Sequence, residues 1–402
     1  MIRGILSIAI VLLQAAHVPA QEVSPLLTVT SRIAGAKLST ATEAGELTFV
    51  VEDKKVQVPR GKLVYWGSPV EPQRGPIVVT SGGSRIVAAD PSVLGGVVTL
   101  KAEQFHIEHD TLGEIRLPQR YIRSIIFELP GGREQYDALL RRHLPADGAD
   151  ALVLLTNGDE LRGTLLELDE DGVTFRSNVG EVALPLTELT AVYFKPLVRA
   201  TQSEEPKLLV GLDDGSLLSA DALEYSANRL QVTLSERVRL DTADAAPVFL
   251  QSMRGGFVYL SDLKPAAFRH VPFLTSAWPY HADANVRGGQ LRAGGRFYPK
   301  GLGLHSAAQL TYVVPQGFER FEADIALDDS AGDRGSVVFR VYLLVDGKWR
   351  QEFASDVVRG PTLPTSVSVP LVGAKALTLM VDFADRGDEL DHADWLNARI
   401  VR

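Results

Sequence analysis

Short runs in which apolar and polar residues alternate recur along the whole chain, and no feature constrains its fold more. The run at residues 320–327 alternates strictly, so Phe321, Ala323 and Ile325 fall on one face of a strand. Other runs are rich in β-branched and aromatic residues and are separated by turn formers. The clearest helical spacing is at residues 134–144, which have one apolar face. The pattern therefore predicts an all-β protein.

Three segments among the first 270 residues share a pattern of strand, tight turn and strand. Their turns contain Gly83, Asn157-Gly158 and Asp214-Gly215. Asn-Gly and Asp-Gly predict a two-residue hairpin turn in which both central residues have positive φ. The first two segments also end alike, with a Leu-Pro step at residues 117–118 and 184–185 before an apolar strand.

We interpret these segments as repeats of a small, strongly bent sheet of about five strands, similar to the SH3-like or Sm-like barrels. Residues 26–66 are a candidate for a further, degenerate copy. After the repeats, residues 265–279 contain three prolines, which predicts a linker.

Beyond this linker, about eight strand-length runs in about 125 residues are typical of an antiparallel jelly-roll sandwich. We expect domains at 21–145, 146–264 and 265–402.

Charge and composition exclude several kinds of partner. The formal net charge is −9 and no basic run is present, which argues against nucleic acid and anionic membrane surfaces. Residues 1–20 combine Arg3, a short apolar stretch and small residues before Gln21, which predicts a cleaved signal peptide. We therefore expect a secreted or periplasmic, cell-envelope protein that is not an integral membrane protein once processed. Without cysteine, disulfides and thiolate metal sites are excluded.

The last third of the chain resembles a known family of modules. The residues that carry the resemblance are Gly294-Gly295, Tyr298, Lys300-Gly301-Leu302-Gly303-Leu304-His305-Ser306, Leu327-Asp328-Asp329, Gly335 to Phe339, Asp346-Gly347 and Asp391-His392-Ala393-Asp394-Trp395. In this order and spacing they resemble the NPCBM domain, a carbohydrate-binding module found beside family 98 glycoside hydrolases. The resemblance implies a β-sandwich and binding of galactose-type sugars.

A sugar site needs an aromatic platform and fixed polar groups. The compact run Asp391, His392, Asp394 and Trp395 offers both, and we predict that Asp328, Asp329 and His305 join it from other loops. Two of these residues have a structural alternative. Trp395 would lie in the core, because aromatic side chains dominate sandwich cores. His305 would be a structural hydrogen-bonding group beside a tight turn.

The same carboxylates allow two further interpretations. Asp328, Asp329 and the later aspartates are oxygen ligands of the type that calcium prefers, so a structural calcium ion is possible, although no EF-hand spacing is present. Asp391 and Asp394 could form the acid pair of a glycosidase, but nothing else in the sequence marks a catalytic cleft. We predict no enzyme activity and no cofactor.

The sequence therefore predicts an exported, non-catalytic protein that recognises glycans or glycoconjugates through a C-terminal sandwich. The alternative is an envelope or extracellular scaffold whose sandwich binds a protein partner. A third hypothesis, an enzyme with its active site between the barrels and the sandwich, would require turnover of a glycan.

Overall fold

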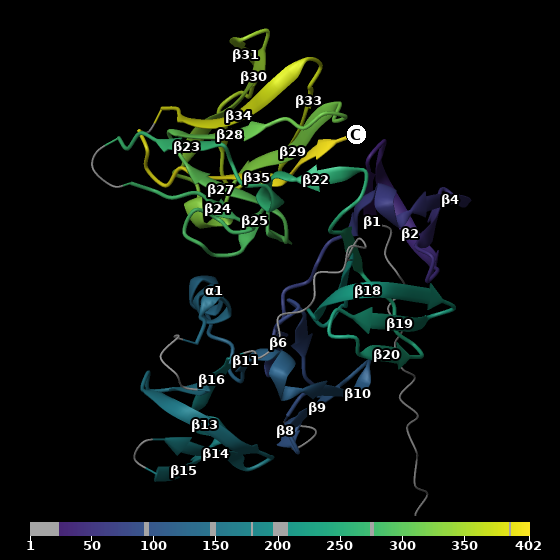
Figure 1. Cartoon of the computed structure of the whole chain (residues 1–402), viewed down its shortest axis with the longest axis vertical. Helices are drawn as coiled ribbons and strands as arrows, with labels where there is room; N and C mark the ends of the chain where they lie inside the picture. The colour runs from purple at the N-terminus through teal and green to yellow at the C-terminus, as the bar shows by residue number, and fades with distance from the viewer. Residues whose placement is uncertain are drawn as a thin grey trace, which may run out of the picture.

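The computed structural model describes residues 24–91, 96–144, 150–177, 180–195, 208–273, 277–385 and 387–402 (Figure 1). The predicted signal peptide at 1–20 lies outside these residues. Apart from one α-helix and five short 3-10 turns, the regular structure of these residues is strand, which confirms the all-β class. No helix within the described ranges is long and apolar enough to cross a membrane.

The chain from Ser24 to Ser252 folds into four small barrels. Residues 26–66, a candidate for a degenerate repeat, form a complete five-stranded barrel. Barrel 1 contains β1 (Ser24–Thr28), β2 (Arg32–Ala41), β3 (Glu46–Val51), β4 (Lys54–Pro59) and β5 (Leu63–Gly67). Barrel 2 contains β6 (Ile77–Thr80), β7 (Arg85–Val87), β8 (Val98–Lys101), β9 (Gln104–His109), β10 (Gly113–Pro118) and β11 (Ile122–Ile126). Barrel 3 contains β12 (Ala151–Leu155), β13 (Glu160–Leu168), β14 (Gly172–Ser177), β15 (Gly180–Pro185) and β16 (Leu189–Phe194). Barrel 4 contains β17 (Leu208–Gly211), β18 (Leu217–Ser226), β19 (Arg229–Leu234), β20 (Arg239–Thr242) and β21 (Phe249–Ser252).

In each barrel the last strand returns to pair with the first; barrels 1, 3 and 4 are simple meanders, whereas in barrel 2 strands β7 and β8 pair with β18 and β13 of other barrels and not with each other. The closing pairs are β1 with β5, β6 with β11, β12 with β16, and β17 with β21. In barrels 1, 2 and 3 a one-turn 3-10 helix follows a proline and leads into the closing strand: η1 (Arg60–Lys62), η2 (Gln119–Tyr121) and η3 (Leu186–Glu188). The proline ends the preceding strand, because it lacks the backbone N–H that a sheet needs. This explains the repeated Leu-Pro step in the sequence.

The hairpin prediction at the glycine turns was right, but the turn type was wrong. Gly158 and Gly215 have φ of 89° and 94°, whereas Asn157 and Asp214 keep negative φ. The amide of Gly158 donates to the Leu155 carbonyl, and that of Gly215 to Leu212. These connections are therefore ordinary turns followed by one left-handed glycine, a form that longer hairpin loops favour.

The barrels associate in two pairs that are nested in the sequence. Closing strand β5 of barrel 1 pairs with closing strand β21 of barrel 4, and β11 of barrel 2 pairs with β16 of barrel 3. One hydrophobic core cluster draws buried side chains from all four barrels. Buried His109 of barrel 2 ties the two pairs together, because its Nε2 atom lies 3.0 Å from a carboxylate oxygen of Asp214 and 3.2 Å from the Ser216 hydroxyl.

The C-terminal part is a sandwich of two antiparallel sheets, which lies above barrels 2, 3 and 4 and beside barrel 1 in Figure 1. The first sheet runs β24 (His281–Ala282), β27 (Gly301–His305), β35 (His392–Val401), β29 (Arg320–Leu327) and β33 (Thr365–Pro370), with β22 (Phe257–Tyr259) also on β35. The second runs β23 (Ala267–His270), β28 (Ala308–Val313), β34 (Ala374–Phe383), β30 (Ser336–Val345) and β31 (Lys348–Ala354), with β32 (Val358–Arg359) on β30. The hairpin of β25 (Leu291–Ala293) and β26 (Arg296–Tyr298) covers the outer face of the first sheet, where Leu291 and Ala293 pack on Ala326 and Leu396. Two 3-10 turns, η4 (Leu260–Asp262) and η5 (Asp329–Ala331), complete the domain.

The sandwich begins earlier than residue 265, the predicted boundary. Strand β22 pairs with β35, and β23, in the proline-containing stretch predicted as a linker, pairs with β28. Phe257 and Tyr259 of β22 also pack with Leu27 and Val64 of barrel 1 in one buried cluster. The stretch that reads as a linker is therefore part of the domain and of its contact with the barrels.

The predicted helix is confirmed as α1 (Arg133–Arg141), which lies between barrel 3 and the sandwich in Figure 1. Its apolar side, with Tyr136 and Leu140, packs on the outside of barrels 2 and 3. On its other side, buried Asp137 accepts two hydrogen bonds from the guanidinium of Arg292 on β25, at 2.7 and 2.9 Å. Glu71, after barrel 1, accepts a third from the same group at 2.5 Å. The barrels and the sandwich are thus joined by apolar contacts and by a buried ion pair.

Candidate functional site

Four connections meet at one end of the sandwich. They follow β23, β27, β29 and β34, because the pairs His270–Ala308, His305–His392, Leu327–Ala393 and Val337–Phe383 all lie at this end of the two sheets. Loops that a rigid sandwich holds together are a common place for binding residues. The chemistry-bearing side chains at this end are an indole and three imidazoles.

The centre of this cluster is a stack of Trp278 on His305. Their ring centroids are 4.8 Å apart and their planes differ by 3°. His392 completes the group, with its ring centroid 6.0 Å from each of the other two. His305 and His392 are neighbours on paired strands, and their side chains lie on the face of the sheet away from the core because Leu304 and Ala393 point into it.

Hydrogen bonds fix the proton positions on two of the imidazoles. The carbonyl oxygen of Ser306 accepts from His305 Nδ1 at 2.9 Å and from His270 Nε2 at 3.0 Å. His270 Nδ1 in turn accepts the backbone N–H of Trp278 at 3.2 Å, which holds the indole in place. In neutral His305 the proton is therefore on Nδ1, and Nε2 is left as an acceptor. His392 is held by Ser330, whose hydroxyl lies 3.0 Å from Nδ1.

Burial favours the neutral form of His305 and His392. Desolvation lowers the pKa of His305, and it lowers the pKa of His392 to about 4, with the neighbouring His305 contributing. A neutral imidazole presents one donor and one acceptor, which suits recognition of uncharged hydroxyl groups. The half-buried Trp278 ring beside them is the kind of apolar surface on which a sugar ring stacks.

The structure separates the predicted site residues into two groups. His305 and His392 are brought together, and Asp391 joins them indirectly: its Oδ2 accepts the Ser306 hydroxyl at 2.6 Å and its Oδ1 accepts the Ser336 amide at 2.9 Å. Burial raises the pKa of Asp391 to about 6. Asp391 thus cross-links two of the loops, and its carboxyl is closed off from solvent.

Asp328, Asp329 and Asp394 lie under the β25–β26 hairpin rather than beside Trp278. Asp328 accepts hydrogen bonds from the amides of Ser330 and Arg292, both at 3.0 Å, and Asp329 accepts from the Gly295 amide at 2.9 Å. Asp394 is fully buried, and desolvation with nearby Asp328 raises its pKa well above the ordinary value. Since neither Asp391 nor Asp394 reaches solvent, this pair has no access to a glycosidic bond.

Trp395 lies in the core, which was the structural alternative to a sugar-binding role for this residue. Its exposure is 0%, and its ring makes edge contacts with Phe339 and Phe321 at centroid distances of 5.0 and 5.9 Å. A ring enclosed in this way offers no face to a ligand, so the proposed platform role for Trp395 is corrected. Within a strand, alternation puts Trp395 on the core side and His392 on the other.

Sequence reasoning missed Trp278 and His270. Both lie in the stretch with Pro265, Pro272 and Pro279, which reads as a linker. The available signal was the Trp278-Pro279-Tyr280 cluster, since aromatic residues are uncommon in a simple spacer. Among the described residues, no three His, Asp or Glu side chains are arranged to hold a metal ion.

Replacing His392 with glutamine is expected to cost less stability in acid than at neutral pH. The folded protein holds the His392 pKa at about 4, below the ordinary 6.5. As the pH falls below 6.5, the unfolded chain therefore takes up a proton that the folded state does not, and wild-type stability falls by on the order of 2 kcal/mol. The variant lacks this loss. Urea denaturation at about pH 7, 5.5 and 4.5 gives the unfolding free energy of the wild type and of the variant at each pH. If the difference between the two proteins were the same at all three pH values, the assignment would be contradicted.

The fold defines a β-sandwich that carries a small polar-aromatic cluster at one end. Residues 256–401 match the NPCBM/NEW2 domain, which confirms the resemblance drawn from the sequence and agrees with β22 as its first strand.

Two curated relatives align with part of this region. A Renibacterium salmoninarum protein named "Putative endo-alpha-N-acetylgalactosaminidase" is 36% identical over 119 residues, which cover 30% of this chain and 8% of that protein. Alpha-1,3-galactosidase B of Akkermansia muciniphila is 32% identical over 119 residues, covering 29% and 14%. The matched part is thus a small fraction of either relative. Among solved structures, the CBM51 module of Clostridium perfringens GH95, in complex with methyl-galactose, is 27% identical and covers 36% of this chain and 99% of its own, with a TM-score of 0.31.

Proposed function

We propose that this protein is an exported, non-catalytic carbohydrate-binding protein that holds a galactose-type sugar against Trp278, His305 and His392. The observation that carries the proposal is the Trp278–His305 stack, with planes 3° apart, beside a second neutral imidazole. The indole supplies a stacking surface, and the fixed His305 tautomer supplies an acceptor for a hydroxyl group.

Three further points support this assignment. The family match of residues 256–401 is to an NPCBM/NEW2 domain. Both aligned relatives carry names that refer to galactose-type sugars. The carboxyls of Asp391 and Asp394 are buried, which favours binding over hydrolysis. Export rests on the signal-peptide pattern of residues 1–20.

Replacing Trp278 with alanine is expected to weaken binding of methyl α-galactoside about tenfold or more, because a stacking contact and the packing of His305 are lost together. His392→Ala should act in the same direction, since a hydroxyl partner of the sugar would be left unpaired. Isothermal titration of the full chain with methyl α-galactoside and with methyl α-glucoside measures affinity and preference.

The matched control is Trp349→Ala, because Trp349 on β31 is 50% exposed and lies at the edge of the other sheet. It should bind as the wild type does. Wild-type protein that binds no glycan on an array, yet captures one defined protein from an extracellular fraction, would favour the scaffold alternative. Release of reducing sugar would favour the enzyme.

A further inference from the structure

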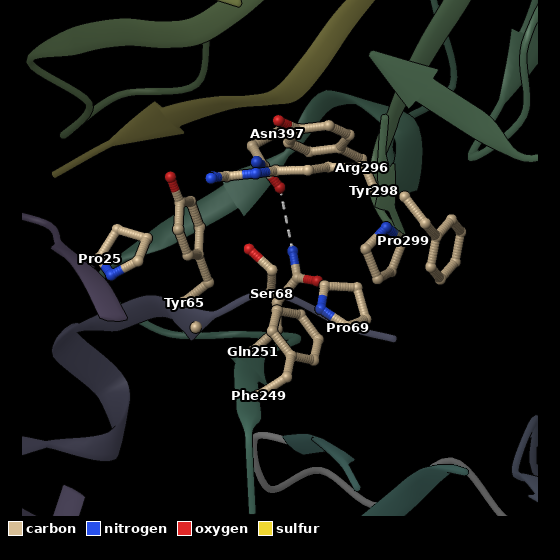
Figure 2. A pocket seen from close by; sticks show the side chains of 12 residues that line it. Pro25, Tyr65, Ser68, Pro69, Phe249, Gln251, Arg296, Tyr298, Pro299 and Asn397 are labelled. Carbon is tan, nitrogen blue, oxygen red and sulfur yellow. Dashed lines mark hydrogen bonds between the residues drawn. The ribbon is translucent and has the colours of Figure 1, made fainter. Parts of the chain in front are cut away.

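A second cleft lies where the barrels meet the sandwich, and nothing in the first site uses it. Figure 2 shows its lining: Tyr65 from β5, Phe249 and Gln251 from β21, and Arg296 and Tyr298 from β26. Pro25, Pro69 and Pro299 complete its walls. The cleft itself is shallow, with about 30 Å³ of space for a water-sized molecule, so a sugar-sized ligand would lie largely across its mouth. It lies at the Gly301 end of β27, whereas His305 of the first site ends that strand.

The floor of this cleft contains a polar atom that the fold leaves without a partner. Gln251 is 1% exposed, and its amide nitrogen donates to the Tyr259 hydroxyl at 3.0 Å and to Asn397 Oδ1 at 3.1 Å. Its carbonyl oxygen, Oε1, is buried and has no hydrogen-bond partner among the described residues. An unsatisfied buried acceptor is costly, so a ligand that donates a hydroxyl to Oε1 would be favoured. Figure 2 shows this amide at the centre of the cleft, under Arg296.

The wall of the cleft carries an unpaired cation. Arg296 is exposed, and none of the carboxylates in the described ranges forms an ion pair with it. Its guanidinium extends along the cleft toward the Tyr65 ring in Figure 2. This differs from Arg292 on the paired strand β25 of the same hairpin, whose guanidinium is engaged by Asp137 and Glu71. A planar guanidinium with free N–H groups binds carboxylate in a bidentate fashion.

Two phenols flank the guanidinium. Burial raises the pKa of Tyr65 and of Tyr298, so both hydroxyls stay protonated and can donate at neutral pH. Their rings and the proline walls supply the apolar surface. The cleft thus combines a cation, two phenolic donors, a buried acceptor and aromatic faces.

We propose that this barrel–sandwich cleft is a second ligand site, and that it takes a carboxylated sugar residue of the hexuronic acid type. The carboxylate pairs with Arg296 and the phenols, the pyranose ring lies against the tyrosine rings, and a hydroxyl donates to Gln251 Oε1. A neutral hexose satisfies the last two contacts only. A proline-rich peptide would use the aromatic walls but would leave Arg296 without its anion.

The test uses the full chain with two probes of the same shape, methyl β-glucuronide and methyl β-glucoside. Ligand-observed saturation-transfer NMR and isothermal titration should show saturable glucuronide binding with a Kd of about 1 mM, and glucoside binding at least fivefold weaker. Arg296→Gln should weaken glucuronide binding about fivefold or more and should remove its dependence on salt. The matched control is Arg254→Gln, another exposed arginine that does not line this cleft.

Two results would overturn the proposal: no saturable glucuronide binding by the wild type, or equal affinity of Arg296→Gln and wild type. Equal affinity for the two probes would also overturn it, because the guanidinium would then play no part. The proposal is independent of the galactoside site, since Trp278→Ala should leave glucuronide binding unchanged and Arg296→Gln should leave galactoside binding unchanged. Failure of one site is therefore visible without failure of the other.

Discussion

Replacing Trp395 with alanine is expected to destabilise the sandwich by roughly 3–5 kcal/mol, the usual range for removing a buried tryptophan. The indole has 0% exposure and fills the space between Phe321 and Phe339, where the two sheets face each other. Hydrogen exchange of β29 and β35 in the full chain should accelerate by two to three orders of magnitude, about tenfold per 1.4 kcal/mol. Galactoside binding should fall only to the extent that the sandwich unfolds.

Two control variants separate burial from aromatic chemistry. Trp395→Phe should be much milder than the alanine variant, because it keeps a ring in place and removes an indole N–H that has no hydrogen-bond partner in the described part of the chain. Trp349→Ala, at a half-exposed position, should leave exchange in β35 unchanged. A folded, stable Trp395→Ala variant that fails to bind sugar would instead restore the platform role predicted from the sequence.

Replacing Asp137 with alanine is expected to cost about 3 kcal/mol, the lower end of the range for breaking a buried ion pair, because buried Arg292 would keep only Glu71 as its counter-charge. The two side chains are 4% and 5% exposed and share two hydrogen bonds. The backbone and side-chain N–H groups of Gln290 would also lose their acceptor, at 3.0 Å in both cases. Exchange in α1 and in the β25–β26 hairpin should rise together, since these two elements meet at this pair.

A second ion pair of similar geometry provides the control. Arg229 and Asp241 of barrel 4 make two hydrogen bonds at 2.9 and 2.7 Å, but both side chains lie at the surface. Asp241→Ala should leave the melting temperature nearly unchanged, since exposed pairs are screened by water and salt. The double variant Asp137→Leu/Arg292→Met should recover much of the loss, because the two buried charges are removed together and Glu71, which is 23% exposed, keeps Arg133 at 3.6 Å. If Asp137→Ala and Asp241→Ala lowered the stability by the same amount, burial of the ion pair at α1 would not be the source of its larger expected effect.

Period-two alternation and turn residues were enough to predict most strands of the sandwich, because those patterns are local. The run at residues 320–327 coincides with β29 (Arg320–Leu327), and Asp346-Gly347 forms the hairpin between β30 and β31 with φ of 50° and 74°. Barrel 1 was less visible as a copy, because its strands β1 and β2 are joined by a turn without glycine. Barrel pairing was not predictable, since it depends on which closing strands meet across long separations in sequence.

The candidate site was predictable only in part, for a related reason. His392 was identified from the compact polar and aromatic run at residues 391–395, and His305 from its place after Gly301-Leu302-Gly303, which forms strand β27 rather than the expected tight turn; strand pairing brings the two histidines together. Asp394 and Trp395 were assigned to the same site from adjacency in sequence, although neighbouring residues of a strand point to opposite faces. Trp278 was missed, because its role comes from a segment that is ordered by His270 and by β23 rather than by any pattern of its own.

The nesting of the barrels also sets an order in which the chain can fold. Barrels 2 and 3 are consecutive, so β11 and β16 can pair as soon as both have been synthesised. Strand β5 ends at Gly67, whereas its partner β21 begins only at Phe249, and Phe257 and Tyr259, which cover Leu27 and Val64, come later still. Long-range pairing is slow and leaves apolar surface exposed in the meantime. Barrel 1, although first to leave the ribosome, is therefore among the last parts to acquire its final neighbours, and a chain truncated before residue 249 would keep that surface uncovered.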